Sequence, residues 1–347
     1  MRLATSKRAW ISLELMPLIS LAIALAGSAP AHANGLVIIP TFDSSITTDP
    51  NAAAIEGVIN SAIGTYENLF SNPINVTIDF QEMNSGLGQS QKNLYSIGYS
   101  AFYSGYSANA ASNNNPAAQM ALALGVVPNQ TLNPVTSSAN LGLATADIRA
   151  LGISCPGCTG PGGFDGIIGL NTALTTPGSP GSSLSFVLTP VVDHEIDEVL
   201  GLGSSLGQSF QTGFPSAEDL FRFAANGTRS YTTNSSANAY FSINGSTDLA
   251  QFDNQNDGGD WGDWQSNPLP FGVLPQVQDA FATPGANPSL GVEITALEAI
   301  GYDLNTPAAT PEPMTLVLSG TGLAVIAAFK RRNGRRSGAT SQLRQIL

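Results

Sequence analysis

Apolar residues between Pro50 and Phe70 recur at intervals of three and four, which is the pattern of an amphipathic helix with one buried face. The repeating positions are Ile55, Val58, Ile59, Ala62, Ile63, Tyr66 and Phe70. Asp49 and Pro50 offer this helix an N-cap and a first-turn proline. Short apolar runs at 36–40 and 74–80 flank it, and the second alternates with period two, so both are predicted to be strands.

The chain after residue 82 gives weaker signals. Residues 83–111 are rich in Ser, Gly and Tyr, and they predict only strands or loops. Residues 116–124 and 145–151 fit short helices, and residues 167–170 fit a strand that follows the glycine-rich stretch 157–166. Few charged residues and abundant Gly, Ser, Asn and Thr point to an extracellular protein rich in strands and loops.

Segment 189–201 carries residues that are typical of both ends of a helix. Thr189 is the predicted N-cap, Pro190 suits the first turn, and Gly201 suits the C-terminal end. Three apolar residues share one face of this helix and are expected to be buried, namely Val192, Ile196 and Val199.

The same helix carries the clearest chemistry. His194 and Glu198 are four residues apart, so one helix face presents an imidazole and a carboxylate that can hold one metal ion. Glu195 lies beside His194 and could act as general base towards the attacking water. The alternative is an exposed helix whose acidic residues only interact with solvent. Any metal ion here has one nitrogen ligand and otherwise oxygen ligands, because His194 is the only histidine after the N-terminal segment.

This helix resembles the zincin helix His-Glu-x-x-His, with Glu198 in place of the second histidine. The stretch Leu36 to Leu304 is similar to PEP-CTERM-associated zincin-like metalloproteases with the pattern His-Glu-x-x-Glu-Val-x-Gly, including the later segments 218–223, 258–264 and 293–303. The resemblance implies an α+β zincin-like domain with a long N-terminal helix, a mixed sheet and a His-Glu active-site helix. It also implies zinc at His194 and Glu198, with Glu195 as the base that helps to cleave a peptide substrate.

The third metal ligand is left open by the sequence. Glu218 and Asp219 follow Glu198 by 20 and 21 residues, a separation similar to that of the third ligand in gluzincins, and Asp219 is the predicted ligand. Alternatively, both lie in the first turn of a helix that begins at Ser216 and interact with its dipole. Tyr302 could stabilise an oxyanion, although an aromatic residue in an apolar run is more often part of the core.

Four aspartates crowd a glycine-rich loop, at positions 253, 257, 260 and 263. The spacing is only partly that of a calcium loop, because Gln255 and Trp264 occupy positions that an EF-hand fills with acidic residues. Calcium binding and a plain polar turn are both open, and the polar turn is favoured.

The two cysteines form a Cys-Pro-Gly-Cys motif. Because exported proteins meet oxidising conditions, a local disulfide between Cys155 and Cys158 is predicted. In a reducing compartment, the same spacing would indicate a redox motif or half of a zinc site.

Both ends of the chain indicate export. Residues 1–33 combine a basic start, an apolar core and an Ala-His-Ala exit, so they predict a cleavable signal peptide and a mature start at Asn34. At the other end, Pro311-Glu312-Pro313 precede the uncharged segment 314–329 and the basic tail 330–347. This segment of 16 residues is close to the minimum of ~17 for a spanning helix. The basic tail is expected to stay in the cytoplasm.

The C-terminal pattern resembles the PEP-CTERM sorting signal of Gram-negative bacteria that produce exopolysaccharide. The resemblance implies that a sorting and processing enzyme of the inner membrane is a partner. It also implies transient anchoring in the inner membrane, followed by delivery to the cell surface or the medium.

Charge excludes one class of partner. Only 4 of the 13 basic residues lie between Asn34 and Pro313, against 24 of the 25 acidic residues, so this part carries a formal charge of −20. Nucleic acid is excluded because its binding depends on Lys and Arg at the phosphates. Divalent cations suit such an acidic protein, and exopolysaccharide stays open as a partner.

These observations predict one zincin-like domain over residues 34–305, followed by a linker with the PEP motif at 306–313. The expected function is that of an exported zinc-dependent metallopeptidase. The alternative is a non-catalytic surface or matrix protein that keeps the zincin-like architecture and binds cations or exopolysaccharide.

Overall fold

The computed structural model describes residues 35–113, 115–177, 185–207 and 213–305. All of them belong to one compact unit. The expected signal peptide, PEP linker, apolar segment and basic tail lie outside the described residues. Within the described ranges, no helix is long and apolar enough to cross a membrane.

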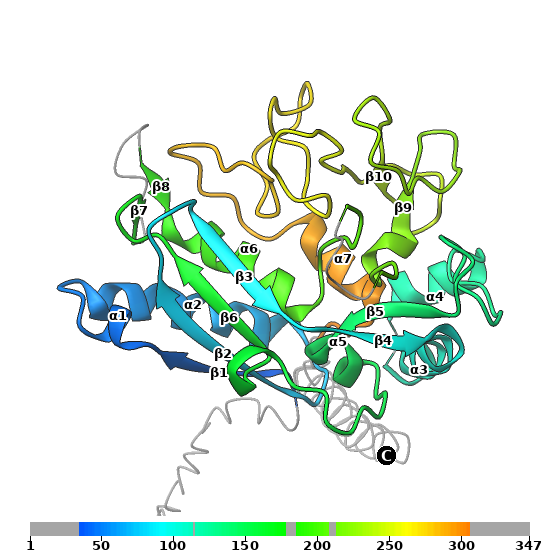
Figure 1. The fold of residues 1–347 in the computed structure, drawn as a ribbon, viewed down its shortest axis with the longest axis horizontal. Helices are drawn as coiled ribbons and strands as arrows, with labels where there is room; N and C mark the ends of the chain where they lie inside the picture. Colours follow the sequence, from blue (N-terminus) through cyan, green and yellow to red (C-terminus); the bar gives the residue numbers. More distant parts are fainter. Residues whose placement is uncertain (1–34, 114, 178–184, 208–212, 306–347) are drawn as a thin grey trace, which may run out of the picture. The chain divides into compact units, whose positions relative to one another are not determined.

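A mixed four-stranded sheet organises the first half of the chain (Figure 1). Its strand order is β1-β2-β6-β3, with bounds β1 Val37–Phe42, β2 Asn75–Glu82, β6 Gly166–Leu170 and β3 Gly88–Lys92. The first three strands run parallel, whereas β3 pairs antiparallel with β6 and forms one edge. Parallel strands need crossover connections, and helix α2 (Ala52–Leu69) provides the first one, between β1 and β2. The predicted strand–helix–strand order is therefore confirmed.

Helix α2 begins later than the sequence predicted. A separate helical turn, α1 (Ser44–Thr47), comes first and is capped by the Asp43 side chain. Helix α2 then begins at Ala52, with Asn51 as its N-cap residue. Asp49 accepts a hydrogen bond from the Asn51 N–H instead of capping the long helix. The buried face of α2 is the predicted one.

Residues 83–111 differ from the prediction of strands and loops alone. After β3 and β4 (Leu94–Gly98), the chain forms a 15-residue helix, α3 (Tyr99–Asn113). Tyr99 and Tyr106 are fully buried on one side of it. Small Ser, Ala and Gly residues occupy much of the rest, so the contrast between apolar and polar faces is too weak to predict this helix from sequence.

The other predicted short elements of the first half are present. Helices α4 (Pro116–Ala123) and α5 (Thr145–Ala150) follow α3, with β5 (Asn140–Ala144) between them. Strand β5 pairs antiparallel with β4. A 3₁₀ turn at Pro161–Gly163 precedes β6, and the short strands β7 (Thr175–Thr176) and β8 (Phe186–Val187) lead into α6 (Leu188–Leu200).

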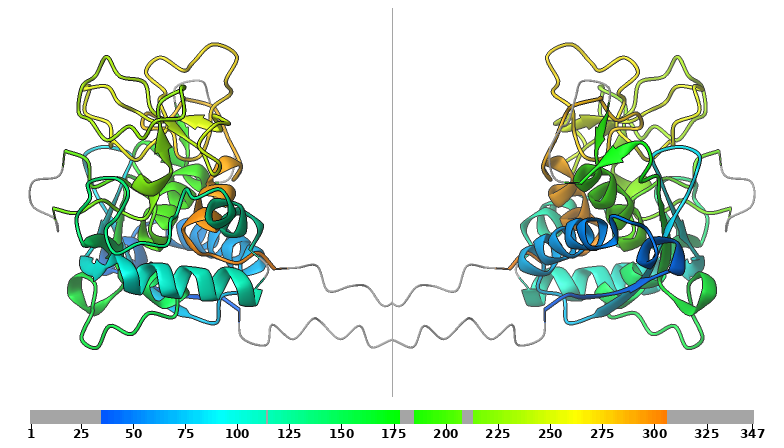
Figure 2. Two further views of the ribbon diagram at one scale, coloured as in Figure 1. Left: turned by 90° about the vertical axis from the view of Figure 1, so that its right-hand side faces the viewer. Right: turned by 90° about the vertical axis from the view of Figure 1, so that its left-hand side faces the viewer.

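The second half consists mostly of loops that gather beyond α6 on the side away from β1 and β2 (Figure 2). Three two-residue strands pair there in the order β11-β10-β9, with bounds β9 Arg222–Phe223, β10 Tyr240–Phe241 and β11 Ala250–Gln251. An aromatic cluster forms their core, in which the Phe252 and Trp264 ring centroids are 5.2 Å apart. Helix α7 (Val292–Ile300) closes the domain, so the architecture is α+β with a mixed sheet and seven described α-helices.

Candidate metal centre

Helix α6 carries the candidate site, and its packing explains its position. Val192, Ile196 and Val199 are fully buried, as predicted. Val199 packs against Gly166 of β6, and on another side of the helix the Tyr66 hydroxyl of α2 lies 2.8 Å from both Asp193 O and Asp197 Oδ1. The helix is therefore held between the sheet and α2.

Both ends of α6 show how the sequence sets its bounds. The N-cap is Val187 with no side-chain hydrogen bond, so the predicted cap at Thr189 lies inside the helix. Gly201 ends the helix as predicted, because its φ of 135° is accessible mainly to glycine.

Lys92 at the end of β3 donates hydrogen bonds to the carbonyl groups of Glu198 and Leu202. A cation at the C-terminal end of a helix interacts favourably with the helix dipole. Lys92 therefore stabilises the packing of β3 against α6.

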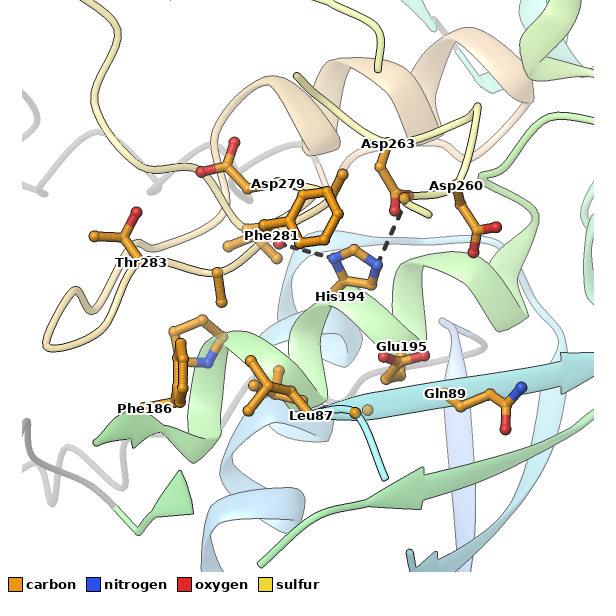
Figure 3. Close-up of a pocket in the computed structure, with 18 of the residues that line it drawn as sticks. Leu87, Gln89, Phe186, His194, Glu195, Asp260, Asp263, Asp279, Phe281 and Thr283 are labelled. Atoms are coloured by element: carbon orange, nitrogen blue, oxygen red, sulfur yellow. Dashed lines mark hydrogen bonds and ion pairs between the residues drawn. The ribbon is translucent and has the colours of Figure 1, made fainter. Parts of the chain in front are cut away.

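Three donor groups converge beside α6. Ligand atoms of His194, Glu198 and Asp263 all lie within 4.8 Å of one another. Figure 3 shows two of them, His194 and Asp263, facing each other, with His194 Nε2 3.7 Å from Asp263 Oδ1. His194 and Glu198 come from one helix face, as expected. Asp263 comes from the loop that follows β11. One imidazole and two carboxylates at this separation can hold a divalent cation.

Neighbouring groups orient these donors. The Nδ1–H of His194 donates to the Val277 carbonyl at 3.0 Å, which leaves Nε2 facing the carboxylates. Ser90 of β3 donates its hydroxyl to Glu198 Oε2 at 2.6 Å. Hydrogen bonds between a metal ligand and a neighbouring group hold the ligand in position at a metal site.

The electrostatics of the group favour a cation. Burial raises the pKa of Asp263 to about 8, although the positive charge of His194 opposes this. Burial and the negative charge of Glu198 raise the pKa of both Glu195 and Asp260. Burial alone would lower the pKa of His194, but the carboxylates around it outweigh burial and raise that pKa to about 10. A divalent cation among these carboxyl groups would favour their ionised forms more strongly than one imidazolium does.

Glu195 lies in the same cleft but outside the three-donor group. It is 5% exposed and packs against β3 at Gly88, where a side chain would collide with its carboxylate. Its Oε2 atom is buried and has no hydrogen-bond partner among the described residues. A buried carboxylate with a free oxygen beside a cation site can take a proton from a bound water.

The cleft has a volume of about 740 Å³ and lies between β3, α6 and the loops of the second half. The polarity of its lining differs between the two sides of His194 (Figure 3). Leu87, Phe186 and Phe281 give a mostly apolar side, which also carries Asp279, and Asp260 with Asp263 gives an acidic side. The cleft can therefore accommodate an extended, partly apolar chain next to the candidate cation.

Asp219 is not brought to His194, contrary to the prediction. Its Oδ2 accepts hydrogen bonds from the Ser205 N–H and the Ser216 N–H, and its Oδ1 accepts from the Ser204 hydroxyl. Glu218 Oε2 accepts from the Gly203 N–H. These carboxylates start a 3₁₀ turn, Glu218–Phe221, and hold the loop after α6. The alternative that placed them at the start of a helix describes their position better.

The four aspartates of the glycine-rich loop divide into two pairs. Asp253 and Asp257 accept hydrogen bonds from the N–H groups of Gln255 and Gly259 in their own turns. Asp260 and Asp263 instead line the cleft at His194. The sequence left calcium binding and a polar turn open for this run, favoured the polar turn, and did not connect the run to the His194 site. The density of aspartates was the one available signal.

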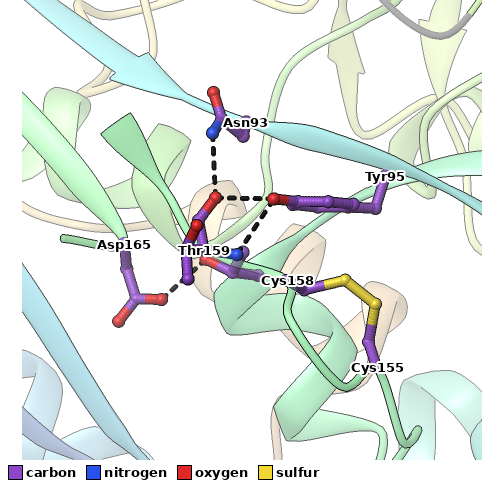
Figure 4. The surroundings of a disulfide bond; sticks show 7 residues. Asn93, Tyr95, Cys155, Cys158, Thr159 and Asp165 are labelled. Carbon is purple, nitrogen blue, oxygen red and sulfur yellow. Dashed lines mark hydrogen bonds between the residues drawn. A yellow bond between two sulfur atoms is a disulfide. The ribbon is translucent and has the colours of Figure 1, made fainter. Parts of the chain in front are cut away.

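Two further predicted residues have structural roles. The Tyr302 side chain is fully buried, and its hydroxyl donates to the Leu200 carbonyl at 2.7 Å, so Tyr302 belongs to the core as the sequence favoured. Cys155 and Cys158 are joined by a disulfide with their Cα atoms 5.5 Å apart (Figure 4). Beside it, the Tyr95 hydroxyl donates to the Thr159 carbonyl at 2.8 Å and holds the loop against β4.

No protein-family model, curated protein or solved structure matches this chain. The arrangement of donors on α6 and in the loops beyond it therefore carries the functional argument.

Proposed function

We propose that this protein is an exported, zincin-like metallopeptidase that uses a divalent cation, with zinc as the first candidate. The observation that carries the proposal is the convergence of His194, Glu198 and Asp263 within 4.8 Å of one another. Glu195 lies in the same cleft, which is large enough for a peptide.

The donor set fits a divalent cation. One oriented imidazole nitrogen and two carboxylates are ligands that zinc accepts, and the acidic surplus around His194 needs a positive charge. When bound, the ion would polarise the scissile carbonyl and lower the pKa of the attacking water. Asp263 replaces Asp219 as the third protein ligand in this proposal.

The chain's own residues would divide the remaining work. Glu195 in its ionised form would take the proton of the attacking water, since its buried Oε2 has no hydrogen-bond partner among the described residues. Val277 would keep the imidazole in the tautomer that ligates through Nε2. Strand β3 is an edge strand of the sheet among the described residues and contributes to the lining of the cleft, so an extended substrate could lie along it.

The zincin-like assignment and the export pathway belong to the same proposal. A mixed sheet with an antiparallel edge strand above the His-Glu helix supports the zincin-like fold. The motifs of both chain ends support secretion and PEP-CTERM sorting, with the inner-membrane processing enzyme as partner.

One observation favours a non-catalytic surface or matrix protein instead. The cation would have a single nitrogen ligand and two carboxylates, and negative ligands make the ion a weaker Lewis acid. Such a centre could bind a cation for stability alone. The alternative predicts bound metal without any dependence of function on Glu195.

The test combines metal content with cleavage of an unfolded protein substrate. His194→Ala, Glu198→Gln and Asp263→Asn should each release the metal, whereas Asp219→Asn should retain it. Glu195→Gln should keep the metal and lose ~10² to 10⁴-fold in cleavage rate. Metal without cleavage in the parent would support the non-catalytic alternative. A parent that binds no metal when zinc is supplied would refute the metallopeptidase.

A further inference from the structure

Gln278 lies at the centre of the site although nothing in its sequence neighbourhood marks it. Its side chain is fully buried. Its N–H donates to Glu293 Oε1 on α7 at 3.0 Å, and its carbonyl accepts from the Trp264 N–H at 2.8 Å. Trp264 Nε1 donates to the same Glu293 oxygen at 3.0 Å. The backbone of Gln278 is therefore fixed relative to Asp263, which precedes Trp264.

The amide group of Gln278 points at the candidate ligands. Its Nε2 donates to Asp263 Oδ1 at 3.0 Å and lies 3.3 Å from His194 Nε2. Its Oε1 is buried and has no hydrogen-bond partner in the part of the chain that the structure describes. A buried amide oxygen without a partner is unfavourable, so a ligand that pairs with it would be stabilising at this position.

Two separations at the Gln278 amide match those between neighbouring ligands of one metal ion, whereas His194 Nε2 and Asp263 Oδ1 are 3.7 Å apart. Bonds of about 2.1 Å place neighbouring ligand atoms roughly 3.0 to 3.4 Å apart in octahedral or tetrahedral coordination. The Gln278 amide lies at 3.0 and 3.3 Å from two of the expected ligand atoms. A half-turn of the amide exchanges its nitrogen and oxygen with little change in shape.

We propose that Gln278 is a fourth protein ligand of the cation, through Oε1. The amide donates to Asp263 in the absence of the ion. With the ion bound, the amide is turned over, so that Oε1 faces the cation and the orphaned oxygen gains its partner. This inference rests on the proposed metal centre at His194, Glu198 and Asp263.

A fourth ligand changes the character of the centre. One nitrogen and three oxygen donors form a harder site than the zinc sites of two or three histidines, and oxygen donors also suit Mn²⁺. We therefore expect the centre to accept Mn²⁺ as well as Zn²⁺. Gln278 also connects the cation to Glu293, so metal binding is expected to stabilise the packing of α7.

The experiment compares Gln278→Met and Gln278→Glu in the protein lacking its signal peptide, with Zn²⁺ alone and Mn²⁺ alone as probes. Affinity is measured by chelator competition, and Tm with and without metal is a second readout. A ligand role predicts that Gln278→Met, of similar length but without the oxygen, binds each metal at least ~10-fold more weakly. Gln278→Glu keeps an oxygen, adds a negative charge and should bind at least as tightly as the parent.

If Gln278 only positions Asp263 and does not bind the ion, Gln278→Glu should give the opposite change in metal affinity. That variant loses the N–H donor to Asp263 and places a carboxylate beside it, so it would bind metal more weakly than the parent, which would overturn the ligand role. Equal affinity in the parent and Gln278→Met would also overturn it while leaving the three-ligand centre intact. A parent that binds neither metal would refute the centre itself. If Gln278→Met does not fold, Gln278→Glu decides alone.

Discussion

Gly88→Ala tests whether β3 positions the proposed base. A Cβ atom on Gly88 would lie 2.9 Å from Glu195 Cδ and 2.8 Å from Val191 Cγ1, whereas ordinary contacts are 3.4–4 Å. The Glu195 carboxyl group must therefore retreat by about 0.5 Å or more, or β3 must move away from α6. Overpacking of this kind costs about 1–3 kcal/mol in the free energy of unfolding.

The substitution should also lower the catalytic rate of the molecules that stay folded. Because a displacement of about 1 Å can cost ~10²-fold in rate, we expect kcat for peptide cleavage to fall roughly 10- to 100-fold. Metal affinity should stay within about 3-fold of the parent, since Glu195 is not a ligand in this scheme.

The assay pairs urea unfolding with initial cleavage rates and chelator competition. Gly64→Ala is the matched control, because Gly64 lies inside α2 with open space around its Cβ position. That control should leave activity unchanged and stabilise the protein by about 0.5–1 kcal/mol. Parent-like stability and rate in Gly88→Ala would refute the proposed contact between β3 and Glu195.

The remaining predictions concern pH, the disulfide and processing. Burial raises the pKa of Glu218 to about 8 and that of Asp279 to about 7, so the folded protein holds protons that the unfolded chain releases near pH 4. Stability should therefore fall as pH rises from 5 to 8, by several kcal/mol or ~10 °C in Tm, and a Tm that rises over this range would contradict the burial argument. Alkylation before reduction should leave Cys155 and Cys158 unlabelled in the exported protein, whereas two labelled thiols would rule out the disulfide in solution. Intact-mass measurement of the secreted form should give a start at Asn34 and loss of residues after Pro313 in a host with the sorting enzyme. Soluble exported protein that retains residues 314–347 would argue against the sorting signal.

Local signals determined much of the first half of the fold. The three- and four-residue spacing over 55–70 predicted α2, and period-two alternation predicted β2, because each pattern is complete within a single element. The bounds were less certain, since Asp43 and Asn51 compete with Asp49 for the cap positions. Helix α3 escaped prediction because small residues cover much of its surface, and only tertiary packing buries Tyr99 and Tyr106.

The sequence by itself determined the part of the site that one helix contains. His194, Glu195 and Glu198 follow from the geometry of α6, where residues four apart share a face whatever the rest of the chain does. Asp263 and Gln278 lie 65 and 80 residues beyond Glu198 and reach the site through loops with only short strands. Their positions depend on the Trp264–Glu293 hydrogen bond and on packing against α7, which no local pattern encodes. The proposed third and fourth ligands therefore come from the tertiary structure, because loop positions are set by long-range contacts rather than by the periodicity of the backbone.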